Sequence, residues 1–109
     1  MALSPFHLAI PVYDLDACRQ FYGEVLGLER GRASEHWTDY NLYGHQLVIH
    51  FKERDSIVEP ESNEVDGKNV PVPHFGVVLP MEEWEKLSEK LKQAEVKFII
   101  EPYVRFKRS

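Results

Sequence analysis

The chain has 109 residues, enough for one small domain with a single core and too few for two independent ones. Hydrophobic residues make up 43% of the sequence and charged residues 28%, a balance typical of a folded globular protein rather than a disordered or fibrous one. The formal net charge of -5 disfavours nucleic acid and anionic membrane surfaces as partners, and no apolar run approaches the roughly 20 residues of a membrane helix.

The first residues and the cysteine content indicate the compartment. Met1 to Pro5 lacks the basic and apolar segments of a secretory signal. Cys18 is the only cysteine, so no intrachain disulfide is possible. We therefore expect a cytoplasmic protein.

The first half of the chain predicts a strand, a helix and three further strands. Alternation over Phe6 to Val12 indicates the first strand. Asp14 is a typical N-cap for the next segment, in which apolar residues recur at helical spacing as far as Leu26, and Gly27 ends the helix. The three further strands are expected at residues 28–32, 36–43 and 46–51.

Residues 52–72 predict an irregular connection. The segment contains Pro60, Gly67 and Pro71, many charges and no convincing periodicity. Loops of that length in compact domains are usually lids or connections between structural halves. We interpret this one as a linker, about 53–72, with some character of a lid.

The second half begins with a similar pattern. Residues 73–80 alternate like a strand, and Met81 to Ala94 predicts a helix whose apolar side contains Trp84, Leu87 and Leu91. Residues 97–100 indicate a returning strand, and 103–107 indicate the start of another.

The two halves place a histidine at the same position. Aligning Pro5-Phe6-His7-Leu8 with Val72-Pro73-His74-Phe75 puts His7 and His74 in equivalent opening strands. The second half then has about two strands fewer than the first, so we expect that the chain stops before the end of the repeat. The alternatives are an imperfect repeat or strands supplied by another subunit.

The alternation of side chains along the predicted strands places three histidines on the same face. His7, His50 and His74 lie opposite the apolar residues that should pack against the helices, on a face that a twisted sheet can curl into a cup. Converging imidazoles there could bind Zn²⁺, Fe²⁺, Mn²⁺ or Ni²⁺. His50 is either a third ligand, a group that polarises the substrate, or an inner-face histidine bonded to another side chain. His36 and His45, near turns, are interpreted as solvated.

A catalytic metal generally also needs a carboxylate ligand, and no acidic residue has a compelling position. Glu101 and Asp39 are better interpreted as exposed or turn-capping residues. The sequence contains no GxSxG, glycine-rich phosphate loop or CxxC motif. Cys18 falls on the apolar side of its helix, where a buried, inert thiol is expected.

Several of these residues also resemble a known family. His7-Leu-Ala-Ile-Pro-Val-Tyr-Asp-Leu, Phe21-Tyr22 and Val25-Leu26-Gly27-Leu28 resemble the vicinal oxygen chelate superfamily, which includes glyoxalase I, extradiol dioxygenases and bleomycin or fosfomycin resistance proteins. Pro73-His74-Phe75-Gly76-Val77 is similar to the opening of that family's second module.

The resemblance implies an α+β fold of two βαβββ modules. These would form a curved, cup-like mixed sheet with helices on its outer face: module one at about 4–52 and an incomplete module two at about 73–109 of a single domain 1–109. It implies that His7 and His74 are metal ligands, and the likeness of Gln46-Leu-Val-Ile-His50 to the strand that holds a ligand Glu in glyoxalase I makes His50 a substitute. The strand expected to provide the final carboxylate does not occur within these 109 residues.

The function implied is a metal-dependent enzyme acting on a small substrate that chelates the metal through two neighbouring oxygens. Dioxygenase-like chemistry comes first and a glyoxalase-type lyase second. A metal-free, ligand-sequestering protein of the bleomycin resistance type is the alternative from another class, with Trp37, Tyr40 and Tyr43 as its substrate pocket. A homodimer is expected, because such modules also pair between chains.

Overall fold

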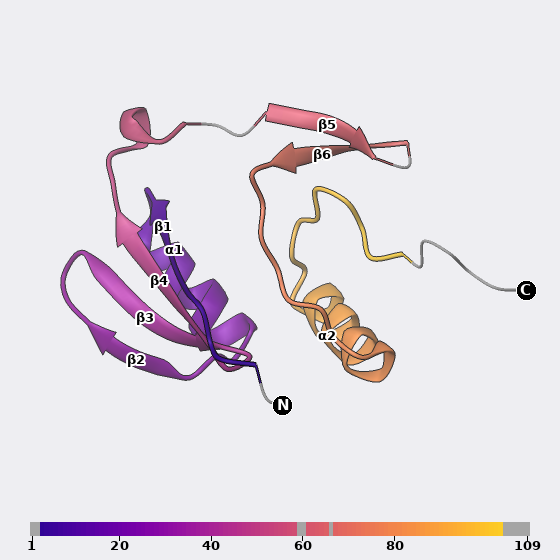
Figure 1. Cartoon of the computed structure of the whole chain (residues 1–109), viewed down its shortest axis with the longest axis horizontal. Coiled ribbons are helices and arrows are strands. Elements are labelled where there is room, and N and C mark those ends of the chain that lie inside the picture. Colours follow the sequence, from indigo (N-terminus) through magenta and orange to yellow (C-terminus); the bar gives the residue numbers. More distant parts are fainter. Residues whose placement is uncertain (1–2, 59–60, 66, 104–109) are drawn as a thin grey trace, which may run out of the picture. The chain divides into compact units, whose positions relative to one another are not determined.

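The computed structural model describes residues 3–58, 61–65 and 67–103. The chain divides into two compact units, Met1–Glu59 and Pro60–Ser109 (Figure 1). Within the described residues there are a four-stranded mixed sheet, a two-stranded sheet and two α-helices, so the predicted α+β class is confirmed. No helix in this part of the chain is long and apolar enough to cross a membrane.

Unit 1 has the predicted order of strand, helix and three strands. Its sheet order is β1-β4-β3-β2, in which β1 pairs with β4 in parallel and the other neighbours are antiparallel. The elements are β1 (His7–Val12), α1 (Leu15–Arg19), β2 (Arg30–Ala33), β3 (Trp37–Leu42) and β4 (His45–Phe51).

The helix of unit 1 begins as the sequence predicts. The backbone N–H of Ala17 donates to Asp14 Oδ1 over 3.0 Å, which satisfies one of the free amides of the first turn. After Arg19 the helix widens into a π-helical segment, Gln20–Val25, rather than continuing as one α-helix. Gly27, at φ 70°, follows its end in the left-handed conformation that glycine adopts without steric cost.

One face of the four-stranded sheet forms the core of unit 1. Its buried centre consists of Val12, Tyr40 and Ile49. Partly buried residues from β1, the helix and the following turn pack against it, namely Ile10, Leu15, Cys18, Tyr22 and Leu28. The buried hydroxyl of Thr38 is also paired, because Arg19 Nε donates to Thr38 Oγ1 over 2.7 Å.

Unit 2 contains a hairpin and one helix. Strands β5 (Glu61–Val65) and β6 (Lys68–Val72) pair antiparallel, and α2 (Met81–Gln93) follows. The helix matches the prediction for 81–94, and Trp84, Leu87 and Leu91 are less exposed than the charged residues around them.

The hairpin corrects the prediction of an irregular connection at 52–72. Residues 61–65 and 68–72 form strands that are mostly exposed, so they carry no apolar alternation by which to recognise them. The dipeptide Asp66-Gly67 in the sequence was the missed signal, since such pairs are typical of two-residue hairpin turns. Gly67 has φ 77°, a left-handed conformation that glycine adopts without steric cost.

The predicted strands at 73–80 and 97–100 are not formed in the described structure. Alternation indicates which side chains share a face, but a strand also needs a neighbouring backbone to pair with. Val78 and Ile99 are correspondingly exposed. The further strand expected from residue 103 falls almost entirely outside the described residues.

Replacing Ile49 by alanine is expected to destabilise unit 1 by about 2–5 kcal/mol, because Ile49 is 0% exposed at the centre of the core. Urea unfolding followed by the fluorescence of Trp37, in a Trp84→Phe background, measures this loss. Val58→Ala is the control, because Val58 is 90% exposed and its loss should change stability by no more than about 0.5 kcal/mol. Equal effects of the two substitutions would contradict this account of the core.

Candidate functional site

The face of the four-stranded sheet opposite α1 carries polar side chains from β1, β3 and β4. Side chains of directly paired residues lie on the same face of a sheet. His7 pairs with Gln46, Asn41 also pairs with Gln46, and Trp37 pairs with His50. We call this surface the polar face; its members include His7, Trp37, Asp39, Asn41, Gln46 and His50. The predicted parity of His7 and His50 is therefore confirmed.

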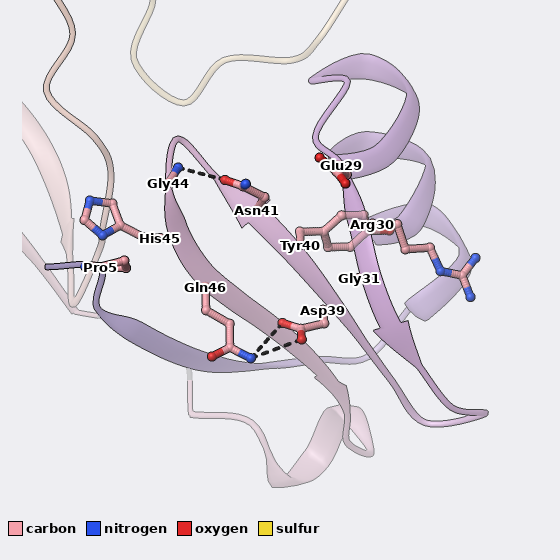
Figure 2. A pocket seen from close by; sticks show the side chains of 10 residues that line it. All are labelled: Pro5, Glu29, Arg30, Gly31, Asp39, Tyr40, Asn41, Gly44, His45 and Gln46. Atoms are coloured by element: carbon pink, nitrogen blue, oxygen red, sulfur yellow. Dashed lines mark hydrogen bonds between the residues drawn. The ribbon is translucent and has the colours of Figure 1, made fainter.

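A chain of hydrogen bonds crosses three strands on the polar face. Gln46 Nε2 on β4 donates to both carboxylate oxygens of Asp39 on β3, over 3.1 Å to Oδ1 and 3.0 Å to Oδ2. Figure 2 shows these two side chains pointing toward each other from neighbouring strands. The amide oxygen, Gln46 Oε1, lies 2.8 Å from Nδ1 of His7 on β1. Because that oxygen can only accept, His7 Nδ1 is the donor and its Nε2 keeps a lone pair.

His74 of unit 2 has the same tautomer as His7, which a hydrogen bond to a nearby residue of its own segment favours. Its Nδ1 lies 2.6 Å from the carbonyl oxygen of Pro71, which can only accept a hydrogen bond. His74 Nδ1 is therefore the donor, and Nε2 again carries the lone pair. An imidazole that donates from one nitrogen to an oxygen and offers the other is the usual state of a metal-ligating histidine.

His45 has the opposite tautomer. The backbone N–H of Phe6 donates to His45 Nδ1 over 3.0 Å, so the lone pair is used there and Nε2 carries the proton. The Phe6 and His45 rings are also in contact, with centroids 4.5 Å apart. His45 is thus a structural residue at the start of β4 and offers no free lone pair to a metal.

The pairing of β1 with β4 places Gln46, rather than His50, beside His7. One of the roles expected of His50 was that of a third ligand beside His7, but His50 pairs with Pro11, which lies four positions along β1 from His7. At about 3.3 Å per residue, that is about 13 Å, too far for two side chains standing perpendicular to the sheet to reach one ion. His50 instead faces Trp37, with ring centroids 6.4 Å apart.

A hollow of about 300 Å³ lies beside Gln46 and Asp39. Its walls also include His45, Asn41 and the start of β2 (Figure 2). Asn41 supports the adjoining turn, because its Oδ1 accepts the backbone N–H of Gly44 over 2.7 Å. The hollow is an open depression lined by both polar and apolar groups.

The three aromatic residues expected to form a substrate pocket do not lie together. Trp37 is on the polar face, with the Arg32 guanidinium 5.8 Å from its ring centroid. Tyr43 lies in the turn before β4 and is 44% exposed. Tyr40 differs from the expectation: it borders the hollow but is 3% exposed, and its ring packs against Tyr22 in the core. Position 40 has the opposite strand parity from 37 and 39, which explains its place.

The sequence did not predict the role of Asp39 on the polar face. It was interpreted as an exposed or turn-capping acid, whereas its carboxylate is the acceptor at one end of the hydrogen-bonded chain to His7. Only pairing between strands reveals this, since His7 lies 39 positions before Gln46 in the sequence. Among the described residues, no group of three or more His, Cys, Asp or Glu side chains is close enough to hold a metal ion.

The chain matches the family model of the glyoxalase/bleomycin resistance protein/dioxygenase superfamily over residues 4–106. It is similar to the crystal structure of a glyoxalase/bleomycin resistance protein/dioxygenase from Alicyclobacillus acidocaldarius, with 30% identity and a TM-score of 0.66. That match covers 84% of this chain and 64% of the other, so the chain spans less than two thirds of that protein.

A second solved structure shares the fold at lower identity. A lactoylglutathione lyase from Agrobacterium tumefaciens is 18% identical, with a TM-score of 0.56 and coverage of 89% of this chain and 73% of that one. No curated protein sequence matches the chain.

Cys18 is partly buried, rather than fully buried as the sequence predicted. Partial burial raises its pKa above the ordinary value of a cysteine thiol, and the nearby Asp14 carboxylate raises it further. Both effects disfavour the thiolate, which is the nucleophilic form. Its side chain packs against the core of unit 1 rather than on the polar face.

Alkylation of Cys18 by iodoacetamide is therefore expected to be slower in the folded protein than in the urea-unfolded protein at neutral pH. A raised pKa means that the thiolate fraction of the folded protein increases only at pH values above those at which the unfolded chain reacts. Mass spectrometry of timed samples measures both rates. Equal rates in the two states across the pH range would contradict the burial of this thiol.

Proposed function

Because the chain belongs to the glyoxalase/bleomycin resistance protein/dioxygenase superfamily, we propose that it is a divalent-metal-dependent enzyme with dioxygenase-like activity. Its substrate is a small molecule that chelates the metal through two neighbouring oxygens. The proposed metal ligands are His7 and His74. That the two serve one ion is proposed by analogy with the superfamily's paired modules, and the hydrogen bond of each imidazole supports its own part of the proposal separately.

The observation that carries this proposal is the common state of the two histidines. His7 donates from Nδ1 to Gln46 Oε1 and His74 donates from Nδ1 to the Pro71 carbonyl, so both keep Nε2 available. A histidine held only by solvent has no such orientation. Two preset imidazoles suit Fe²⁺, Mn²⁺, Zn²⁺ or Ni²⁺. When bound, the ion supplies a Lewis acid that stabilises negative charge on substrate oxygens.

The remaining residues of the polar face suit the binding of a small aromatic or anionic molecule. Trp37 offers an apolar ring, and Arg32 places a positive charge beside it. His50, next to Trp37, can donate or accept a hydrogen bond, which fits the role of polarising a substrate better than that of a ligand beside His7.

Two other functions are distinguished by their chemistry. A glyoxalase-type lyase uses the same metal but isomerises a hemithioacetal, and the similar Agrobacterium protein is a lactoylglutathione lyase. A metal-free sequestering protein would need an aromatic pocket. It has less support, because Tyr40 is buried in the core and only Trp37 and Tyr43 are left to line one.

We also propose a cytoplasmic homodimer. The single Cys18 is consistent with a reducing compartment, and modules of this superfamily pair between chains. Sedimentation equilibrium tests the dimer, and a monomer at every concentration measured would refute it. Cell fractionation tests the compartment.

Substituting His7 or His74 by alanine is expected to weaken metal binding by at least about 100-fold, more than the roughly 10–100-fold cost of losing an outer partner of a ligand. Calorimetric titration of the metal-free protein with Zn²⁺ or Ni²⁺ measures affinity and stoichiometry. His36→Ala is the matched control and should bind as the wild type does. Stoichiometric metal that survives both substitutions would rule out the assigned ligands.

Activity assays separate the proposed reactions. The Fe²⁺-loaded protein is expected to cleave the ring of catechol, with turnover lost in His7→Ala and His74→Ala and retained in His36→Ala. Conversion of the hemithioacetal of methylglyoxal and glutathione, without catechol cleavage, would favour the lyase. Tight binding of bleomycin by the metal-free protein, with neither reaction, would favour the sequestering protein.

A further inference from the structure

We propose that Asp39 sets the tautomer of His7 through Gln46, which makes Asp39 and Gln46 positioning residues for the imidazole. The inference rests on the proposed function for what His7 Nε2 binds. The tautomer itself is a property of the metal-free chain and is tested there.

The first step is the orientation of the Gln46 amide. A carboxylate can only accept hydrogen bonds, and both oxygens of Asp39 are within 3.1 Å of Gln46 Nε2. Turning the amide over would place Gln46 Oε1 against two carboxylate oxygens, with no hydrogen between them. Asp39 therefore holds the amide nitrogen on its own side and directs the amide oxygen toward β1.

The second step is the proton of His7. With the amide oxygen 2.8 Å from His7 Nδ1, the hydrogen bond favours the tautomer of the neutral ring that carries its proton on Nδ1. In the other tautomer, the lone pair of His7 Nδ1 would face the Gln46 amide oxygen, and two acceptors would meet at that distance. A net hydrogen bond of ordinary strength biases such an equilibrium by about threefold to tenfold. Nε2 is then the nitrogen with the lone pair, pointing away from the chain of hydrogen bonds.

Sheet topology brings the three side chains together. The strands β1, β4 and β3 are adjacent in that order. Gln46 pairs directly with His7 on one side. On the other side Asp39 is its diagonal neighbour, because Asp39 pairs with Val48 and Gln46 pairs with Asn41. Diagonal neighbours on one face are within reach of a long side chain such as glutamine.

His45 provides an internal reference for the opposite tautomer. The Phe6 backbone N–H, which can only donate, faces His45 Nδ1 at 3.0 Å and leaves the proton on Nε2. The same protein thus holds one histidine beside an obligatory acceptor and one beside an obligatory donor. His45 lies one residue before Gln46, so its signal also reports whether this end of β4 keeps its structure.

The experiment is a two-dimensional ¹⁵N–¹H NMR spectrum of the histidine rings in the metal-free full chain, about two pH units above the ordinary imidazole pKa of about 6.5. In the wild type we expect His7 mainly with the proton on Nδ1 and His45 mainly with the proton on Nε2. In Asp39→Asn the residue can donate as well as accept, so the Gln46 amide is no longer held. The His7 tautomer ratio should then move toward the Nε2–H form by about threefold to tenfold.

A rescue variant separates this effect from charge and from loss of structure. In Asp39→Asn with Gln46→Glu, the asparagine donates to the new carboxylate, which again faces His7 with an obligatory acceptor, and the net charge equals that of the wild type. The Nδ1–H form should return. Glu35→Gln removes the same charge from an exposed residue between β2 and β3 and should change nothing. The His45 signal should stay constant throughout.

Several outcomes would overturn the inference. These are a His7 ring already in the Nε2–H form in the wild type, a tautomer ratio that Asp39→Asn leaves unchanged, or a double variant that fails to restore the Nδ1–H form while His45 remains native. A zinc titration of the same variants should show binding weaker by up to about threefold to tenfold in Asp39→Asn, the factor by which the tautomer ratio shifts, and recovery in the double variant.

The experiments can refute the tautomer inference and the proposed function independently of each other. If the tautomer follows Asp39 and is rescued as expected but the wild type binds no metal, the inference stands and the proposed function falls. If metal binding needs His7 while the tautomer is indifferent to Asp39, the inference falls and the proposed function stands.

Discussion

The register of β1 against β4 is the constraint on which the candidate site depends. It pairs His7 with Gln46 and, two positions further on, Ala9 with Val48. A slip of one residue would turn every side chain of β1 to the other face, burying His7 and exposing Ile10 and Val12. The burial of that apolar face against α1 therefore also holds the imidazole beside the Gln46 amide.

This dependence explains how a small unit can hold an ordered polar group at an exposed surface. Isolated surface hydrogen bonds contribute little, because water competes for both partners. Here each partner is attached to a strand whose other face packs into the core, and Thr38 and Arg19 tie β3 to the helix. The positions of Asp39, Gln46 and His7 are thus set by apolar packing, and their hydrogen bonds only select among side-chain orientations.

Three histidines of this chain show that the partner of one ring nitrogen decides the chemistry of the other. His7 and His74 face acceptors and keep Nε2 available, whereas His45 faces a backbone donor. Composition alone treats these residues alike. Membership of the glyoxalase/bleomycin resistance protein/dioxygenase superfamily supplies the context in which two available imidazoles matter.

What the sequence determined was local or periodic. Alternation and helical spacing predicted the elements of unit 1, the Asp14 cap, α2 and the faces of His7 and His50, because each depends on residues that are close in the chain. The sequence did not predict the strands at 61–65 and 68–72, because they are mostly exposed and show no apolar alternation. Only the tertiary structure decided that Gln46 rather than His50 neighbours His7, that Tyr40 lies in the core, and that Asp39 reaches the imidazole through Gln46. Those relations join residues up to 39 positions apart, and their physical cause is strand pairing set by the packing of the whole sheet.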